Sequence, residues 1–224
     1  MPATGRGRPP VRPDARGGPA FEPLTPDQLA DRLARWIDRG GPGRLRVGID
    51  GDETTGTAEL TGRVAAALTA LDRPVVRVST RWWWRAASVR LEFGRQDVES
   101  RLTGWVDSGA LNREVLDPLA PGGSGRFLTR LRDPDRDRAV RDEYRQAPAG
   151  AVLLLDGPLL ATLELDLDLR VLVGVSVGRL GRVLPPDRQW ELRAFAEYAR
   201  RWPAPEVVLS YDHPTNPAVR GLPR

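Results

Sequence analysis

The segment that decides the fold reads RLRVGIDGDETTGTA and spans residues 44–58. Apolar and polar side chains alternate over residues 44–50, which is typical of a β-strand. A glycine-framed loop, residues 51–58, follows directly. Beyond it, apolar side chains recur at helical spacing, and residues 74–79 (PVVRVS) predict a second strand. A strand, loop, helix and strand form a βαβ unit, which implies a parallel sheet with a right-handed crossover.

The loop keeps the glycine frame of the phosphate-binding pattern G-x-x-x-x-G-K-[ST] but departs from it at two positions. In that pattern the Lys reaches the β- and γ-phosphates, and the Ser or Thr hydroxyl holds Mg²⁺. Thr57 stands at the Lys position and Ala58 at the hydroxyl position. All 34 basic residues of the chain are arginine, so no lysine can be supplied from a neighbouring strand.

Two interpretations of the loop remain open from the residues alone. Backbone N–H groups at the helix N-terminus favour an anion, whereas Asp52, Glu53 and Glu59 add negative charge that opposes one. A tight strand-to-helix turn that uses glycine for its backbone geometry explains the same residues and is the favoured interpretation. The candidate nucleotide-binding residues of this degenerate loop are Gly51, Asp52, Glu53, Thr54, Thr55, Gly56, Thr57 and Ala58.

Composition limits the classes of function. Hydrophobic residues make up 40% and charged residues 29% of the 224 residues, as in ordinary globular proteins. Arginine in place of lysine indicates the coding bias of a GC-rich bacterium, and the net charge is only +4, so we do not expect a nucleic-acid partner. The chain has no cysteine and one histidine, His213, which argues against disulfides and against cysteine or histidine metal sites. No metal site is therefore expected.

Organisation along the chain predicts one domain with two tails. Residues 1–22 are rich in Gly, Pro and Arg and are expected to be disordered. Residues 23–217 form the predicted domain, whose first helix starts at Thr25-Pro26, and residues 218–224 form a predicted C-terminal tail. No apolar run approaches the roughly 20 residues of a membrane helix, and the N-terminus lacks the apolar stretch of a signal peptide. We therefore expect a cytoplasmic protein without a membrane partner.

Further strands complete the predicted sheet. The continuous apolar runs at residues 151–156 (AVLLLD) and 171–177 are typical of strands buried on both faces, and residues 206–211 predict a last strand. Five parallel-type strands that alternate with helices indicate a three-layer α/β domain. Residues 126–132 (RFLTRLR) are expected to form a hairpin strand after a glycine-rich turn.

Several of these stretches, in this order, resemble bacterial uridine-kinase-like P-loop proteins. They are RLRVGIDG, PVVRVS, NREVLDPLAPGGSGRFLT and APAGAVLLLDGPLL, and the resemblance covers roughly residues 25–217. It implies a three-layer P-loop kinase-like fold with a mainly parallel five-stranded sheet and a small hairpin and lid insertion. It also implies transfer of the γ-phosphoryl group of ATP or GTP to the 5′-hydroxyl of uridine or cytidine.

The family's working residues, carried over to this chain, are largely replaced. The resemblance places the phosphate lysine at Thr57, the Mg²⁺ hydroxyl at Ala58 and the catalytic aspartates near Arg81 and Trp82, so no catalytic residue is intact. It keeps one acidic residue, Asp156, as the Walker-B-like position, although an Asp at the end of a strand often caps the next turn, and with no hydroxyl at Ala58 capping is the favoured interpretation. The remaining implied positions are the lid arginines Arg179 and Arg182 and a turn beside the purine base at Tyr211, Asp212, His213 and Pro214.

A triplet of tryptophans between two arginines is the unusual addition. If the strand continued through it, alternation would bury Trp83 and expose its neighbours, or the reverse. Filling of the vacated cleft is the first interpretation, a protein interface the second, and stacking on a nucleobase the third. The candidate ligand or interface residues are Arg81, Trp82, Trp83, Trp84 and Arg85. The lone His213, in a proline-rich turn, is expected at the surface.

Three functional hypotheses follow. The first is a catalytically defective pseudokinase, retained to bind a ligand or protein, with no cofactor. The second is an active nucleoside or small-molecule kinase with a rearranged phosphate site, which would use ATP and Mg²⁺ and depend on Arg81, Asp156 and Arg179. The third is a partner-binding module built on the tryptophan and arginine patch. A nucleotide, a nucleoside, another protein and a second copy of the chain are the candidate partners.

Overall fold

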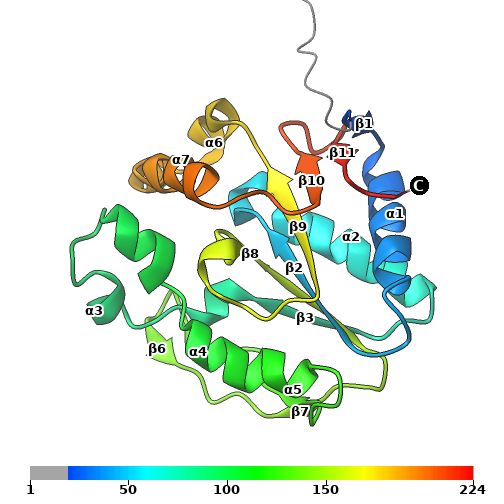
Figure 1. Cartoon of the computed structure of the whole chain (residues 1–224). Coiled ribbons are helices and arrows are strands. Elements are labelled where there is room, and N and C mark those ends of the chain that lie inside the picture. The colour runs from blue at the N-terminus through cyan, green and yellow to red at the C-terminus, as the bar shows by residue number, and fades with distance from the viewer. Residues whose placement is uncertain (1–19, 224) are drawn as a thin grey trace, which may run out of the picture.

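The structure of the protein is a computed structural model that describes residues 20–223. Its central sheet contains β1 (Glu22–Pro23), β2 (Leu45–Asp50), β3 (Val75–Ser79), β8 (Val152–Gly157), β9 (Leu169–Gly174), β10 (Val207–Ser210) and β11 (Ala218–Arg220). The strands lie in the order β1-β11-β10-β9-β2-β8-β3 (Figure 1). The five strands from β10 to β3 are parallel, as predicted, and β11 and β1 extend the sheet antiparallel at one edge.

Alternate side chains of β8 point to opposite faces of the sheet and join two separate cores. Val152 and Leu154 belong to the core shared with α1 (Pro26–Asp38) and α2 (Thr57–Ala70), which pack side by side. Leu153 and Leu155 belong to the core under the helical segment at residues 108–119. A helix layer therefore covers each face, which confirms the predicted three-layer α/β architecture.

The first helix begins where the sequence places it. Thr25 is the N-cap of α1: its hydroxyl accepts a hydrogen bond from the Gln28 N–H, and the Gln28 side chain accepts one from the Thr25 N–H. This capping box and a proline at the first helical position fix the start of the helix. Leu29, Leu33 and Ile37 then fall on one face and are fully buried.

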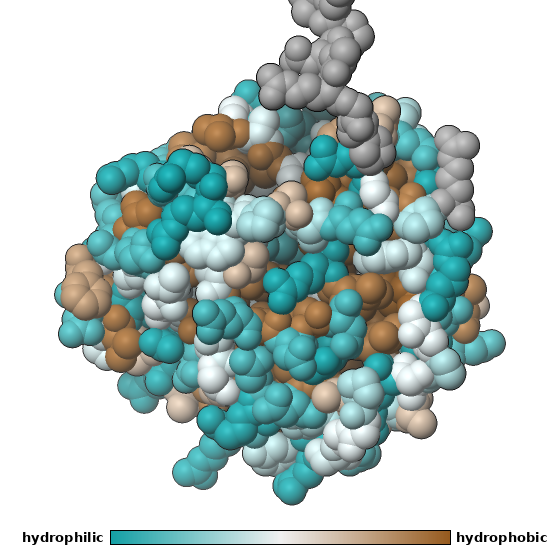
Figure 2. Space-filling model, viewed as in Figure 1, coloured by the Kyte–Doolittle hydropathy of each residue, from teal (hydrophilic) through white to brown (hydrophobic). Residues whose placement is uncertain are grey.

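The remaining helices are short and cover the second face and the top of the sheet. They are α3 (Ala87–Arg90), α4 (Ser108–Leu111), α5 (Asp117–Leu119), α6 (Val177–Val183) and α7 (Glu191–Arg201), with π-helical turns at Ser100–Gly104 and Asn112–Leu116. Hydrophobic side chains reach the surface near α6 (Figure 2), where Val177 is 60% exposed. No helix within residues 20–223 combines the length and apolarity needed to cross a bilayer.

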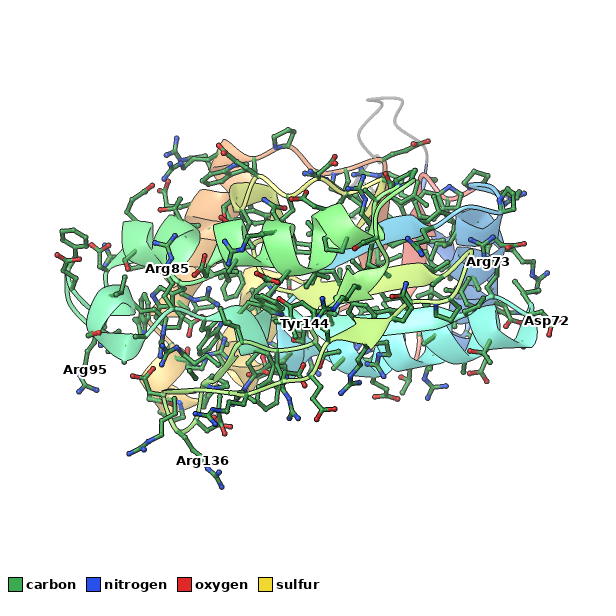
Figure 3. The ribbon with its side chains drawn as sticks, turned by 90° about the horizontal axis from the view of Figure 1, so that it is seen from below. Asp72, Arg73, Arg85, Arg95, Arg136 and Tyr144 are labelled. Carbon is green, nitrogen blue, oxygen red and sulfur yellow. The ribbon has the colours of Figure 1, made fainter. Side chains whose placement is uncertain are left out.

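The insertion between the two halves of the sheet consists of two small antiparallel pairs. β4 (Arg126–Phe127) pairs with β7 (Arg145–Gln146), and β5 (Arg132–Asp133) pairs with β6 (Arg138–Ala139). The single hairpin strand predicted at residues 126–132 is therefore interrupted in its middle. The tip of the β5–β6 hairpin carries Arg136, which points away from the molecule (Figure 3).

The structure corrects the predicted ends of the domain. Glu22, assigned to the N-terminal tail, pairs with Val219 in the sheet, while residues 1–19 of that tail lie outside the described part of the chain. The predicted C-terminal tail is wrong for residues 218–223. Its backbone pairs with β10, and Val219 and Leu222 are buried at 2% and 6% exposure, because they close the open side of the core under α1.

Candidate functional site

The glycine-framed loop is a closed turn. Residues 53–55 form a 3₁₀ helix, and Gly56 adopts a left-handed conformation with φ of 90° just before α2. The N–H groups of Thr55 and Gly56 donate to the carbonyls of Asp52 and Glu53, and the Thr54 N–H donates to the Asp52 carboxylate at 3.0 Å. Three amides that an open phosphate cradle would present to a ligand are thus bonded within the loop itself.

Thr57 is buried beneath this turn, at the position where the phosphate-binding pattern has lysine. Its side chain is 1% exposed, and its hydroxyl donates to the Asp52 carbonyl at 3.0 Å. A Cβ atom added to Gly51 would lie only 2.4 Å from that hydroxyl, so Gly51 is required for this packing. The residue has become part of the core under the loop, while the neighbouring Ala58 offers only a methyl group to solvent.

Arginine side chains hold the loop from outside. Arg188 reaches Asp52 at 2.6 Å and Glu191 at 2.7 Å. Glu191 in turn binds Arg101 at 2.8 Å, with the two side chains only 2% and 3% exposed. Arg81 donates to Glu53 at 2.9 Å and also binds Asp135. We call the six charged side chains around the loop the loop network. They are Asp52, Glu53, Arg81, Arg101, Arg188 and Glu191.

The loop network fixes the ionisation of Asp52 and leaves little free space. Burial acts to raise the pKa of Asp52, but the charge of Arg188 and the hydrogen bonds from Thr54 outweigh it, and the pKa lies below its usual value. Asp52 is therefore a carboxylate at neutral pH. The cavity between the loop and β3 has a volume of about 30 Å³, which is room for about one water molecule.

Asp156 lies at the carboxyl end of β8, as predicted for a Walker-B-like acid, and is 8% exposed. Burial raises its pKa, against the lowering effect of a hydrogen bond with Ser79 and the charge of Arg77. The interpretation of Asp156 as a cap of the following turn is wrong. That task falls to Asp50, whose carboxylate accepts the N–H groups of Leu159 and Leu160 at 2.8 and 3.0 Å.

Asp50 is one of the ionisable residues that sequence reasoning missed. Its carboxylate also accepts a hydrogen bond from the Tyr198 hydroxyl on α7. Burial is the largest influence and raises the pKa of Asp50 to about 6, although the hydrogen bonds from Tyr198, Leu159 and Leu160 favour the charged form. The only signal in the sequence is a carboxylate at the end of a strand that is otherwise apolar.

The raised pKa of Asp50 makes stability depend on pH. Between about pH 4 and pH 6 the carboxyl group of Asp50 is protonated in the folded state and ionised in the unfolded state. Its contribution to the free energy of unfolding is therefore fully present below pH 4 and is lost as the pH rises through 6. A shift of about two pH units corresponds to about 3 kcal/mol. We expect the free energy of unfolding of the wild type, relative to Asp50→Asn, to fall by up to this amount between pH 4 and pH 7. Urea unfolding at each pH measures it, and parallel curves for the two proteins would contradict it.

The tryptophan triplet is divided among three environments. Trp83 is fully buried, while Trp82 and Trp84 are half-buried. Trp84 meets Trp105 edge-on at 5.1 Å, with Arg90 over its ring at 5.0 Å. Trp83 is thus more buried than both neighbours, as strand alternation would have it, but the backbone is not a strand, because residues 80–83 form a 3₁₀ helix immediately after β3. Trp83 belongs to the core under the helical segment at residues 108–119, and Trp84 lines the small cavity beside the loop.

Of the predicted arginines, the structure brings only Arg81 to the loop. Arg179 and Arg182 lie on α6 and do not line the cavity beside the loop, and Arg85 borders a different pocket that faces α3. Arg188 takes the place expected for the lid arginines. Pro185-Pro186 ends α6 and starts a new 3₁₀ turn, which directs Arg188 at Asp52.

The predicted purine turn lies beside the start of α6. Tyr211 is buried, and the Asp212 carboxylate accepts a hydrogen bond from the Ser176 N–H at 2.6 Å. His213 is exposed, as expected. Among residues 20–223, no three Asp, Glu or His side chains gather as a set of metal ligands.

Comparison with known proteins identifies the fold. A protein from Bacillus stearothermophilus, described as a possible uridine kinase, has a similar structure, with a TM-score of 0.58 and 16% sequence identity. The match covers 78% of this chain and 93% of that one. The fold is that of uridine-kinase-like P-loop proteins. A protein from Silicibacter sp. TM1040, provisionally assigned as a fructose transport system kinase, matches at 20% identity and a TM-score of 0.54 over 84% and 99% of the two chains. The sequence matches no protein-family model and no curated protein.

Proposed function

We propose that this protein is a catalytically defective member of the kinase-fold proteins, which has kept the fold for binding and lost phosphoryl transfer. The observation that carries the proposal is the ion pair between Asp52 and Arg188 at 2.6 Å. The carboxylate of Asp52 accepts the loop amide of Thr54 and the guanidinium of Arg188, which are the two kinds of donor that a phosphate would use. The carboxylate of Asp52 therefore supplies the loop with an internal anion in place of a phosphate.

The residues present do not fit Mg²⁺ and a nucleoside triphosphate. The Thr57 hydroxyl is bonded to a carbonyl, Ala58 has no hydroxyl, and the cavity beside the loop measures about 30 Å³. Phosphoryl transfer depends mainly on positioning and on stabilisation of charge. Loss of one stabilising donor commonly costs about 10²–10³ in rate, and here the lysine, the metal ligand and the catalytic carboxylate are all replaced.

The rearranged-kinase hypothesis finds no support in the geometry. Arg81, which it needs as a phosphate ligand, is already shared between Glu53 and Asp135. Arg179 lies on α6, outside the residues that line the cavity beside the loop. The carboxylate of Asp156 faces Ser79 and Arg77. With Arg81, Arg179 and Asp156 placed in this way, we propose no second function for the loop.

The proposal predicts that the full chain neither binds ATP or GTP nor phosphorylates a nucleoside. ATP or GTP at 5 mM, together with Mg²⁺, stabilises the fold by less than about 0.4 kcal/mol if its dissociation constant is above 5 mM. We expect calorimetry to show no heat above dilution and uridine or cytidine to remain unphosphorylated. A uridine kinase of the same fold is the positive control. Transfer to either nucleoside at a rate near 1 s⁻¹, on the order of the slower ordinary kinases, would refute the proposal.

A further inference from the structure

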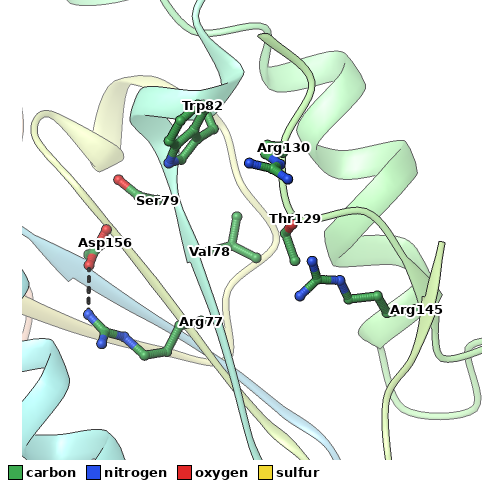
Figure 4. Close-up of a pocket in the computed structure, with 8 residues that line it drawn as sticks. All are labelled: Arg77, Val78, Ser79, Trp82, Thr129, Arg130, Arg145 and Asp156. Carbon is green, nitrogen blue, oxygen red and sulfur yellow. Dashed lines mark ion pairs between the residues drawn. The ribbon is translucent and has the colours of Figure 1, made fainter. Parts of the chain in front are cut away.

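A second and larger cavity lies outside the loop, between the edge strand β3 and the insertion. Its volume is about 380 Å³, within the range of small-molecule sites. Arg77 and Ser79 border it from β3, and Thr129, Arg130 and Arg145 border it from the insertion (Figure 4). Trp82, Val78 and Asp156 complete the lining. This cavity is called the β3 pocket below.

The arginines of the β3 pocket are only loosely paired. Arg130 and Arg145 share one carboxylate, Asp142, at 3.6 and 3.9 Å, and Arg77 lies 4.0 Å from Asp156. In the loop network the corresponding distances are 2.6 Å for Arg188 with Asp52 and 2.8 Å for Arg101 with Glu191. Beyond about 3.2 Å an N–H···O contact is no longer a good hydrogen bond.

The donors of Arg130 and Arg145 are therefore free for a ligand. Neither side chain donates a hydrogen bond to any group within residues 20–223. Asp142 is directed elsewhere, because one of its oxygens accepts both the N–H and the hydroxyl of Thr129, at 2.9 and 2.7 Å. Three guanidinium groups with two carboxylates leave the pocket and its rim with one excess positive charge when all five groups are ionised.

Besides the arginines the pocket offers an aromatic wall and hydrogen-bonding groups. The guanidinium of Arg130 lies 5.8 Å from the centre of the Trp82 ring, close enough for a cation–π contact. Ser79 and Asp156 lie on the β3 and β8 side, across the pocket from Arg145 (Figure 4). An oxyanion, a planar ring and a hydroxyl are the ligand groups that match these three parts.

We propose that the β3 pocket binds a small planar-ring compound that carries one oxyanion group, either a phosphate ester or a carboxylate. Arg130 and Arg145 hold the oxyanion, Trp82 contacts the ring, and Ser79 and Asp156 accept a hydrogen bond from a ring or sugar hydroxyl. Such a ligand neutralises the excess charge of the pocket. It needs neither the glycine-framed loop nor a nucleoside triphosphate, so the inference stands independently of the lost phosphoryl transfer.

Calorimetry on the full chain with matched compounds tests this ligand chemistry. Uridine 5′-monophosphate and 4-hydroxybenzoate carry the oxyanion, whereas uridine and phenol lack it, and inorganic phosphate lacks the ring. We expect at least one of the first two to bind at least tenfold more tightly than its uncharged counterpart and than phosphate. Binding of only the first identifies a phosphate ester, and binding of only the second identifies a carboxylate. Equal binding of charged and uncharged members of both pairs, or no binding of either anion at 5 mM, overturns the proposal.

Substitutions then locate the site. We expect Arg130→Gln and Arg145→Gln each to weaken binding by about tenfold to a hundredfold, the usual effect of one charged hydrogen bond. Arg136→Gln is the matched control, because Arg136 lies on the same insertion, is 82% exposed and points away from the pocket. Arg130 and Arg145 are about half exposed, so their loss should leave the melting temperature unchanged. Unaltered affinity in the Arg130→Gln/Arg145→Gln double variant overturns the assignment, and Trp82→Leu gives an independent reading of the ring contact.

Discussion

Glu191→Ala is expected to lower the free energy of unfolding by about 3–5 kcal/mol, the usual result of leaving one partner of a buried ion pair alone. Glu191 and Arg101 are 2.8 Å apart and 2% and 3% exposed. One terminal nitrogen of Arg101 is already buried without a hydrogen-bond partner, so its charge depends on Glu191. Arg188 loses a partner as well but retains Asp52. Urea unfolding monitored by circular dichroism measures the change.

Two further variants separate charge from packing. Glu197→Ala, on the same helix, removes an exposed carboxylate that pairs with Arg200 and should cost no more than about 1 kcal/mol. Replacement of both buried partners, Arg101→Met with Glu191→Leu, should recover most of the stability, because no unpaired charge remains. If Glu191→Ala proves as mild as Glu197→Ala, the buried pair contributes nothing and this account of the loop network is wrong.

The parts of the fold that the sequence predicts are those with local signals. The apolar run at residues 151–156 forms β8, and the glycine-framed loop lies between a strand and a helix as its pattern requires. The antiparallel strand β11 escapes prediction because it has only three residues, between Pro217 and Gly221. Short edge strands of this kind are stabilised by their neighbours in space and have too few residues for a recognisable alternation.

The candidate site is less predictable because long-range ion pairs build it. Arg188 binds Asp52 from 136 positions away, and Arg101 binds Glu191 from 90 positions away. A chain with 34 arginines gives no local sign of which one reaches the loop. The sequence does show that Thr57 and Ala58 lack the needed groups. Only the structure shows that Asp52 and Arg188 pair with each other and close the loop at this position.

This closure explains why replacing the two missing side chains should fail to restore a nucleotide site. In Thr57→Lys/Ala58→Thr the new ammonium group would enter a site that holds the carboxylate of Asp52 and would pair with it. A carboxylate about 4 Å from a phosphate oxygen costs about 4 kcal/mol at an effective dielectric constant near 20. The double variant should therefore bind Mg²⁺ and ATP no better than the wild type.

Addition of Asp52→Asn to that double variant is expected to tighten ATP binding by about a thousandfold, the equivalent of those 4 kcal/mol. Asparagine keeps an acceptor for the Thr54 N–H and removes the charge that repels the phosphates, while Arg188 stays beside the loop through its pair with Glu191. The matched control is Asp72→Asn in the same background, since Asp72 is exposed at the far end of α2 and changes the net charge equally (Figure 3). Calorimetry with ATP and Mg²⁺ compares the four proteins. Tight binding by the double variant alone, or an equal gain from Asp72→Asn, would show that the carboxylate of Asp52 is not what closes the loop to nucleotides.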